Sequence, residues 1–251
     1  MRIAVLMPAF NEEGRLARTL SELGTAVSGS LAHEAANAHE LTVFLVDDGS
    51  TPPIDEASIG AASKGLRVVL ARHAVNLGQG AALETARRLA LDPRWHEGPR
   101  AFDAFVTMDS DGQHDPADVI ALARAVVGGA DVALGDRFAG NSDVPRSRRM
   151  LLFFARWFER LTTGVSLSDA HNGLRAFGTR AIEVMQIRQN RMAHASEITR
   201  LISASSHGLR VVEVPVSVRY TRESLAKGQR ASGALAILVD LFQGFLFGGE
   251  R

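Results

Sequence analysis

Residues 104–114, A-F-V-T-M-D-S-D-G-Q-H, join a short apolar run to a pair of carboxylates. The first five residues predict a buried β-strand, and Asp109 and Asp111 follow it directly. Alternate residues of an extended segment point the same way, so both carboxylates can face one cation. Hard oxygen ligands suit Mg²⁺ or Mn²⁺, with Gln113 as a further ligand and a diphosphate completing the coordination shell. The alternative is a solvated acidic turn before the helix predicted over 116–127.

Two further acidic turns follow apolar runs earlier in the chain. They are V-D-D-G-S at 46–50 and P-A-F-N-E-E at 8–13. A carboxylate such as Asp48 can accept hydrogen bonds from a nucleobase or from ribose hydroxyls, and Glu12 is available to the same ligand. Both turns also have local explanations, because aspartate commonly starts a turn and Asn11 can cap a helix whose first turn is acidic.

Strand-like and helix-like segments alternate through the first 140 residues. The expected strands cover residues 3–7, 41–46, 66–70, 104–108 and 132–134, and the expected helices cover 12–23, 78–91 and 116–127. Residues 24–40 are either a loop or an extension of the first helix. This alternation forms βαβ units, which predicts an α/β fold with a mostly parallel sheet flanked by helices. Ligands of such sheets bind beyond the carboxyl ends of the strands, where the three acidic turns lie.

The second half of the chain predicts mostly helices. They cover residues 150–161, 179–185, 195–205 and 231–247, and a strand is expected over 210–218. The helices over 150–161 and 231–247 have apolar faces but are shorter than the roughly 20 residues that cross a bilayer. Helices of this kind, with arginines beside the first, can lie in a membrane interface. They can also pack in the core or at a homo-oligomer interface.

The composition excludes several functions. The chain has 251 residues, of which 28 are Lys or Arg and 28 are Asp or Glu, so binding to nucleic acid through bulk charge is not expected. The absence of cysteine excludes disulfides and cysteine-ligated zinc and permits a reducing compartment. The apolar run at the N-terminus is too short for a secretion signal, which agrees with a cytoplasmic protein.

Four motifs resemble those of the family 2 glycosyltransferases of GT-A fold, in order and in spacing. They are P-A-F-N-E-E (8–13), V-D-D-G-S (46–50), N-L-G-Q-G-A-A (76–82) and D-S-D-G-Q-H (109–114). Later motifs are similar to the dolichyl-phosphate mannosyltransferase-like branch, the polyprenyl-phosphate glycosyltransferases. They are G-D-R (135–137), D-A-H-N-G-L-R-A-F (169–177) and V-P-V (214–216).

The resemblance implies an inverting glycosyltransferase that takes a sugar from a nucleotide-sugar donor. The acceptor would be a polyprenyl (undecaprenyl or dolichyl) phosphate, or a saccharide hydroxyl in cell-envelope polysaccharide synthesis. We expect one GT-A domain over 1–251, with a Rossmann-like nucleotide-sugar-binding part at 1–140 and a helical, acceptor- and membrane-facing part at 141–251. We also expect a cytoplasmic protein at the inner face of the membrane, with a homo-oligomer or a membrane-protein partner as further possibilities.

The family's site residues carry over position by position. The nucleoside would be held by Pro8, Ala9, Glu12, Val46 and Asp48. The metal, Mg²⁺ or Mn²⁺, and the diphosphate would be organised by Asp109, Asp111 and Gln113. Arg137 would contact the acceptor phosphate or the diphosphate, and Lys227 would lie in a basic loop that closes over both.

The acceptor determines whether the reaction needs a base. The resemblance implies direct displacement at the anomeric carbon, with the metal and arginines stabilising the diphosphate leaving group. A phosphate acceptor is already ionised near pH 7 and needs positioning more than deprotonation. A sugar hydroxyl needs a carboxylate base, for which Glu197 and Asp169 are the candidates. Glu197 is equally well explained by its place near the start of a predicted helix.

Other functions fit the motifs less well. A nucleotidyltransferase needs a glycine-rich, basic N-terminal loop, and a dehydrogenase needs G-x-G-x-x-G after the first strand; neither is present. The intact Asp109 and Asp111 pair argues against a catalytically inactive nucleotide- or lipid-binding relative. Two positions depart from the family: Gln79 stands where a basic residue is usual, and the D-x-x-S-G-F-R pattern is D-A-H-N-G-L-R at 169–175.

Overall fold

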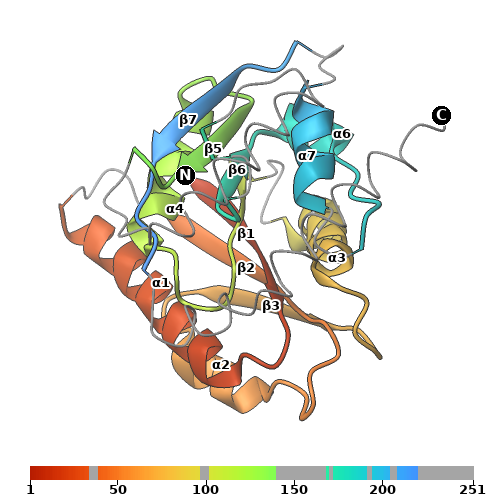
Figure 1. The fold of residues 1–251 in the computed structure, drawn as a ribbon. Coiled ribbons are helices and arrows are strands. Elements are labelled where there is room, and N and C mark those ends of the chain that lie inside the picture. Colours follow the sequence, from red (N-terminus) through yellow and green to blue (C-terminus); the bar gives the residue numbers. More distant parts are fainter. Residues whose placement is uncertain are drawn as a thin grey trace.

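The computed structural model describes residues 1–33, 39–96, 102–139, 168–169, 172–190, 194–203 and 208–219. These residues form one seven-stranded sheet with helices on both faces (Figure 1). The expected α/β fold with a mostly parallel sheet flanked by helices is confirmed. Within these ranges no helix has both the length and the apolar character needed to cross a bilayer.

The sheet has the strand order β3-β2-β1-β4-β6-β5-β7. Its strands are β1 (Arg2–Ala9), β2 (Glu40–Asp47), β3 (Arg67–Arg72), β4 (Ala104–Thr107), β5 (Val132–Asp136), β6 (Arg175–Phe177) and β7 (Val211–Pro215). All neighbours pair in parallel except β6, which is antiparallel to both β4 and β5. The carboxyl ends of β1, β2 and β4 therefore meet at one edge of the sheet.

Helices cover the two faces of the sheet in separate groups (Figure 1). They are α1 (Glu13–His33), α2 (Glu56–Ala62), α3 (Gln79–Leu91), α4 (Pro116–Val127), α6 (Thr179–Val184) and α7 (His194–Ser203), with a short 3₁₀ turn over Pro93–Trp95. α1, α2 and α4 pack on one face, and α3, α6 and α7 pack on the other.

The apolar runs that predicted the strands explain the two cores. In β1, Val5 faces the core under α1 and α4, whereas its neighbours Ala4 and Leu6 face the core under α3. A parallel strand with helices on both sides is buried at every position, so its sequence is continuously apolar rather than alternating. The same holds for β2, in which Val43 and Phe44 lie in opposite cores and are fully buried.

The predicted elements of the first half are all present, with shifts of a few residues at their ends. The first helix continues to His33, so the start of the 24–40 segment is a helix extension. Besides the 3₁₀ turn, two elements have no counterpart in the prediction: α2, which Asp55 caps through the backbone N–H groups of residues 57 and 58, and β6. The helices predicted over 150–161 and 231–247 lie outside the described residues.

The β6 strand comes from the second half of the chain, yet it lies inside the sheet between β4 and β5. Ala176 pairs with Val106 on one side and with Ala133 on the other. Because β6 and β7 both join this sheet, the second half of the chain contributes to the same layer as the first. The insertion places Gly173 and Arg175 directly beside the end of β4.

Candidate active site

Three acidic turns meet at the carboxyl edge of the sheet. The β1 turn (10–13) and the β2 turn (47–51) are joined by hydrogen bonds. Asn11 N donates to Ser50 Oγ (3.0 Å), and Thr51 N donates to Asn11 Oδ1 (2.9 Å). The β4 turn (109–114) follows the strand on the other side of β1. The expectation that the three turns share one edge is therefore met by the sheet topology.

Asp47 stabilises the β2 turn itself. Its buried carboxylate accepts hydrogen bonds from Ser50 N (2.9 Å), Ile54 N (3.0 Å) and Arg72 Nε (3.1 Å). Burial alone would raise the pKa of Asp47, but the hydrogen bonds from Ser50, Ile54 and Arg72 outweigh burial and lower it. Asp47 thus stays ionised as an anchor of the turn.

Asp48 holds a second loop, residues 73–78, which we call the α3 loop. Its carboxylate accepts hydrogen bonds from Leu77 N (3.0 Å) and Gly78 N (2.8 Å), and His73 Nδ1 lies 2.7 Å from Oδ1. The side chain is buried. In this arrangement Asp48 shapes the edge of the sheet by fixing the α3 loop, and direct contact of Asp48 with a nucleoside stays a prediction.

The other predicted nucleoside residues differ in what they can offer a ligand. Val46 is fully buried in the core beneath α3, so its side chain does not reach the edge. Pro8 and Ala9 are buried at the end of β1, and Ala9 O accepts a hydrogen bond from Asp48 N (2.8 Å). Glu12 forms an ion pair with Arg15 on α1. These positions shape the edge mainly through the backbone.

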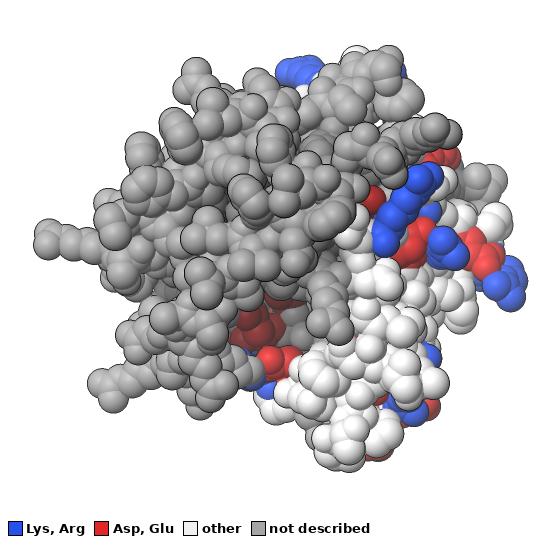
Figure 2. All heavy atoms as spheres, turned by 45° about the vertical axis from the view of Figure 1, so that its right-hand side comes forward, with Lys and Arg blue, Asp and Glu red and all other residues white. Residues whose placement is uncertain are grey.

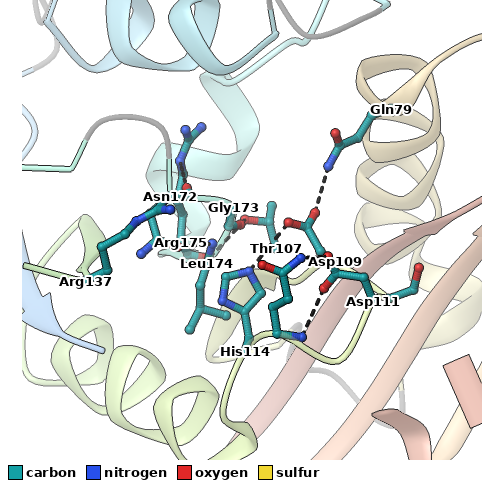
Figure 3. Close-up of polar contacts among 12 residues, drawn as sticks. Gln79, Thr107, Asp109, Asp111, His114, Arg137, Asn172, Gly173, Leu174 and Arg175 are labelled. Atoms are coloured by element: carbon teal, nitrogen blue, oxygen red, sulfur yellow. Dashed lines mark hydrogen bonds and ion pairs between the residues drawn. The ribbon is translucent and has the colours of Figure 1, made fainter. Parts of the chain in front are cut away.

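The β4 turn brings two carboxylates together (Figure 3). Gln79 Nε2 donates a hydrogen bond to Asp109 Oδ1 (2.7 Å), and His114 Nε2 lies 3.5 Å from Asp109 Oδ2. Asp111 accepts hydrogen bonds from the backbone N–H (3.0 Å) and the side-chain amide of Gln113. Burial, and secondly the charge of Asp109, raise the pKa of Asp111.

These residues fit a divalent cation. The two carboxylates carry like charges that repel each other in a partly buried turn. A cation that lies between them removes this repulsion and stabilises the turn. The described residues contain no group of three or more His, Asp or Glu side chains that could hold a metal by themselves. A cation at Asp109 and Asp111 would therefore take further oxygens from water or from a diphosphate, as Mg²⁺ commonly does. On the face in Figure 2, acidic side chains lie beside a part of the described surface that carries no Lys, Arg, Asp or Glu.

Asp169 and Arg137 form a buried ion pair. Arg137 donates to Asp169 Oδ2 from Nε (2.5 Å) and from its backbone N–H (3.1 Å). Asn172 Nδ2 donates to the same oxygen (3.2 Å), and Arg175 Nε donates to Asn172 O (2.9 Å). This network joins the end of β5 to the segment before β6. It gives Asp169 and Arg137 a structural role, so a direct role in catalysis stays a prediction for both.

Glu197 lies near the start of α7 and holds the segment that precedes this helix. Its Oε2 accepts hydrogen bonds from the backbone N–H groups of Arg188 (2.9 Å) and Gln189 (2.8 Å). The adjacent Asn190 accepts from Gly80 N (2.9 Å), which brings the segment to the start of α3. Lys227 lies outside the described residues.

Sequence reasoning gave too little weight to Gln79 and Gly173. Gln79 stands where the family usually has a basic residue, a departure that argues against a phosphate contact at this position, and its amide contacts Asp109. Gly173 lies against the same carboxylate, since a Cβ on this residue would be 2.5 Å from Asp109 Oδ2. Both lie in motifs of the sequence, N-L-G-Q-G-A-A and D-A-H-N-G-L-R, but neither motif shows which strand end it approaches.

We expect Gly173→Ala to displace the Asp109 carboxylate and to lower activity. The backbone φ of Gly173 is not positive, so alanine does not force a left-handed conformation, and the three atoms nearest to its methyl group all belong to Asp109. A displacement of about 1 Å in a reacting group can cost roughly 100-fold in rate. The measurements are kcat/KM and the melting temperature. Gly60→Ala is the control, because a methyl group there meets no atom within 4 Å. Full activity of Gly173→Ala would contradict this role of the glycine.

The fold and the acidic edge define a class of protein. A mostly parallel sheet with acidic turns at the carboxyl ends of neighbouring strands places its ligand site at that edge, as in the GT-A fold that the motifs resemble. The family model of Glycosyl transferase family 2 matches residues 4–185. This chain belongs to that family and is a glycosyltransferase.

Similar proteins agree with this assignment. An uncharacterized protein of Methanocaldococcus jannaschii is 31% identical, over 98% of this chain and 93% of its own length. The undecaprenyl-phosphate mannosyltransferase of Micrococcus luteus is 26% identical, over 93% of this chain and 89% of its own. A UDP-N-acetylglucosamine–dolichyl-phosphate N-acetylglucosaminyltransferase of Methanococcus voltae is 26% identical, over 90% of this chain and 89% of its own length. The expected resemblance to the polyprenyl-phosphate branch is confirmed.

Solved structures share the fold. The glucosyl-3-phosphoglycerate synthase of Mycobacterium tuberculosis, in complex with Mn²⁺, UDP and phosphoglyceric acid, superposes with a TM-score of 0.60 at 18% identity. The match covers 96% of this chain and 78% of that chain.

Proposed function

We propose that this protein is an inverting glycosyltransferase that moves a sugar from a nucleotide-sugar to a polyprenyl phosphate, with Mg²⁺ or Mn²⁺ held by Asp109 and Asp111. The observation that supports this most directly is the carboxylate pair of the β4 turn, at the sheet edge where the β1 and β2 turns also lie. The relatives named for undecaprenyl and dolichyl phosphate supply the class of acceptor.

The contacts of the candidate bases support a phosphate acceptor. Asp169 is buried in an ion pair with Arg137, and Glu197 accepts two backbone hydrogen bonds. Each carboxylate already serves as an acceptor within the protein, whereas a sugar hydroxyl must lose a proton to a base as it attacks. A phosphate oxygen is already ionised near pH 7 and attacks the anomeric carbon once it is positioned.

The β4 turn would act on the leaving group. A divalent cation bound there would offset the charge that develops on the nucleoside diphosphate as the bond to the sugar breaks. Asp109 and Asp111 would bind that cation, and Gln113, which contacts Asp111 through backbone and side chain, would keep Asp111 oriented toward it. The β1 and β2 turns, joined through Asn11 and Ser50, would bind the nucleoside.

A panel of nucleotide-sugars with a short-chain polyprenyl phosphate tests the function. We expect one donor to give a lipid-linked sugar in the presence of Mn²⁺ or Mg²⁺ and none after chelation. A water-soluble saccharide serves as the competing acceptor. Transfer to the saccharide alone would reject the lipid acceptor, and metal-independent transfer would reject the metal assignment.

We expect Asp48→Ala to weaken donor binding more than turnover. The carboxylate fixes the α3 loop, and the loop contributes equally to the ground state and the transition state if it contacts only the nucleoside. KM for the donor should therefore rise, by about tenfold for the loss of hydrogen bonds to a charged group, with a smaller change in kcat. A fall in kcat at unchanged KM would contradict this role.

We further propose that the enzyme works as a peripheral protein at the inner face of the membrane and that Lys227 contacts phosphate groups there. The protein should co-sediment with vesicles containing anionic lipid, less so at high salt, because headgroup attraction is screened. Lys227→Ala should lower activity on the lipid acceptor. Lys64→Ala is the matched control, because Lys64 is the only other lysine in the chain and is exposed. Vesicle binding absent at low salt would contradict the membrane proposal.

A further inference from the structure

Two consecutive residues at the start of α3 join the two acidic turns that flank β1. Gly78 N donates to Asp48 Oδ2 (2.8 Å), and Gln79 Nε2 donates to Asp109 Oδ1 (2.7 Å). Asp48 belongs to the β2 turn and Asp109 to the β4 turn. Figure 3 shows Gln79 reaching from α3 toward the Asp109 carboxylate. The proposed nucleoside and metal sites are therefore connected through one short piece of backbone and one amide.

The backbone that carries Gln79 is held in place. Gly78 caps α3 with φ 99°, a conformation that favours glycine, and Gln79 is the first residue of this 13-residue helix. On the next residue, Gly80 N donates to Asn190 O (2.9 Å). The position of the Gln79 backbone therefore depends on the Asp48 carboxylate on one side and on the Asn190 carbonyl on the other.

The Asp109 carboxylate is confined on its two sides. Oδ1 accepts from Gln79, whereas Oδ2 lies against Gly173 and 3.5 Å from His114 Nε2. Gly173 and His114 limit where the carboxylate can move, and Gln79 supplies a directed bond that selects one orientation. Without Gln79 the confinement by Gly173 would remain, but the orientation of Oδ1 would not be fixed from the α3 side.

We infer that Gln79 is a positioning residue that orients Asp109 for the cation and couples cation binding to nucleotide binding. This inference rests on the proposed function. A nucleotide that orders the β2 turn also orders the α3 loop through Asp48, and with it the base from which Gln79 holds Asp109. Binding of the nucleotide and of the cation therefore favour each other, and the coupling is reciprocal by linkage.

The chemistry of the amide suits this role. An amide N–H donates a hydrogen bond to Asp109 without cancelling its charge, so the carboxylate keeps its full attraction for a divalent cation. A lysine at the same place would put a positive charge within hydrogen-bond distance of Asp109 and compete with the cation. The difference between glutamine and lysine should therefore appear in metal affinity.

The test measures Mn²⁺ and nucleotide binding by titration calorimetry, with UDP and GDP as probes, on the full chain. The variants are Gln79→Ala, Gln79→Asn and Gln79→Lys, and the control is Gln186→Ala, which removes an exposed glutamine outside the site. Gln79→Ala should weaken Mn²⁺ by about tenfold in the presence of the nucleotide. Gln79→Asn should behave like Gln79→Ala because it is too short to reach, and Gln79→Lys should bind Mn²⁺ most weakly, with a dependence on salt.

The affinity for nucleotide without metal separates positioning from a structural effect. In Gln79→Ala the nucleotide affinity without metal should stay within about twofold of the parent value, and the melting temperature should be unchanged. The factor by which Mn²⁺ increases the nucleotide affinity should fall by about the same tenfold as the Mn²⁺ affinity. Equal Mn²⁺ affinity in the parent, Gln79→Ala and Gln79→Lys proteins would overturn the inference and leave the proposed function intact. A parent protein that binds neither nucleotide in a metal-dependent way would overturn both.

Discussion

Asp111→Asn is expected to abolish sugar transfer and at the same time to stabilise the metal-free protein. Asparagine removes one of the two charges that would bind the cation, whose contribution to catalysis is several kcal/mol, so kcat/KM should fall by about 10³-fold or more. The amide keeps the size and much of the hydrogen-bonding capacity of the carboxylate toward Gln113, so the fold should be retained. The measurements are transfer activity, Mn²⁺ binding and thermal unfolding.

The stability change follows from the raised pKa of Asp111. Its pKa in the folded protein lies above the ordinary value of 3.8, because of burial first and the charge of Asp109 second. The folded state therefore binds the proton more tightly, and this stability is lost as the pH rises through the folded pKa. At neutral pH the ionised Asp111 costs stability that asparagine restores. The melting temperature of Asp111→Asn should therefore exceed that of the parent at neutral pH, and the difference should vanish at pH values below 3.8.

Asp118→Asn is the matched control for this experiment. Burial also raises the pKa of Asp118, against the lowering effect of a hydrogen bond from Ser217 N (2.7 Å), and the charge of Asp115 adds to the rise. Asp118 is not one of the two carboxylates proposed to bind the cation. It should keep Mn²⁺ binding and activity. If Asp111→Asn also transfers sugar at the parent rate, the metal assignment is wrong.

Asp169→Ala should destabilise the protein strongly. Removing one partner of a buried ion pair leaves the other charge in a poor environment and typically costs about 3–5 kcal/mol. Here the Arg137 guanidinium would stay buried without the carboxylate that accepts from its Nε and also from the Arg137 backbone N–H. A loss of this size corresponds to a fall in melting temperature of about 10 °C for a chain of this length. Denaturant unfolding measures the free energy directly.

A double-mutant cycle separates the structural role of Asp169 from a catalytic one. Asp169→Leu combined with Arg137→Met should be less destabilised than the sum of the single variants, because neither charge then stays buried alone. Activity should follow the fraction of folded protein. A folded, stable Asp169→Asn protein that binds donor normally but has lost turnover would instead make Asp169 a catalytic base.

The prediction from sequence succeeded where burial imposes a pattern on neighbouring residues. β1, β2 and β4 lie between helices on both faces, so each is a run of apolar residues that can be recognised locally. β6 was missed because three residues, Arg175–Phe177, are too few to show a period, and its place in the sheet depends on pairing with β4 and β5. α2 has a local signal, because Asp55 directly before it accepts hydrogen bonds from the backbone N–H groups of residues 57 and 58.

In the candidate site, too, local sequence patterns predicted some features and only the tertiary structure determined the others. Asp109 and Asp111 are two residues apart at the end of an apolar run, so their common direction follows from the geometry of an extended chain. Their partners do not follow from it. Gln79 lies 30 residues from Asp109, and Arg137 lies 32 residues from Asp169. Local patterns therefore predicted which charges gather at the sheet edge, whereas the order of the strands determined which of them pair with each other, because hydrogen bonds and ion pairs act over a few ångströms in space and are independent of separation along the chain.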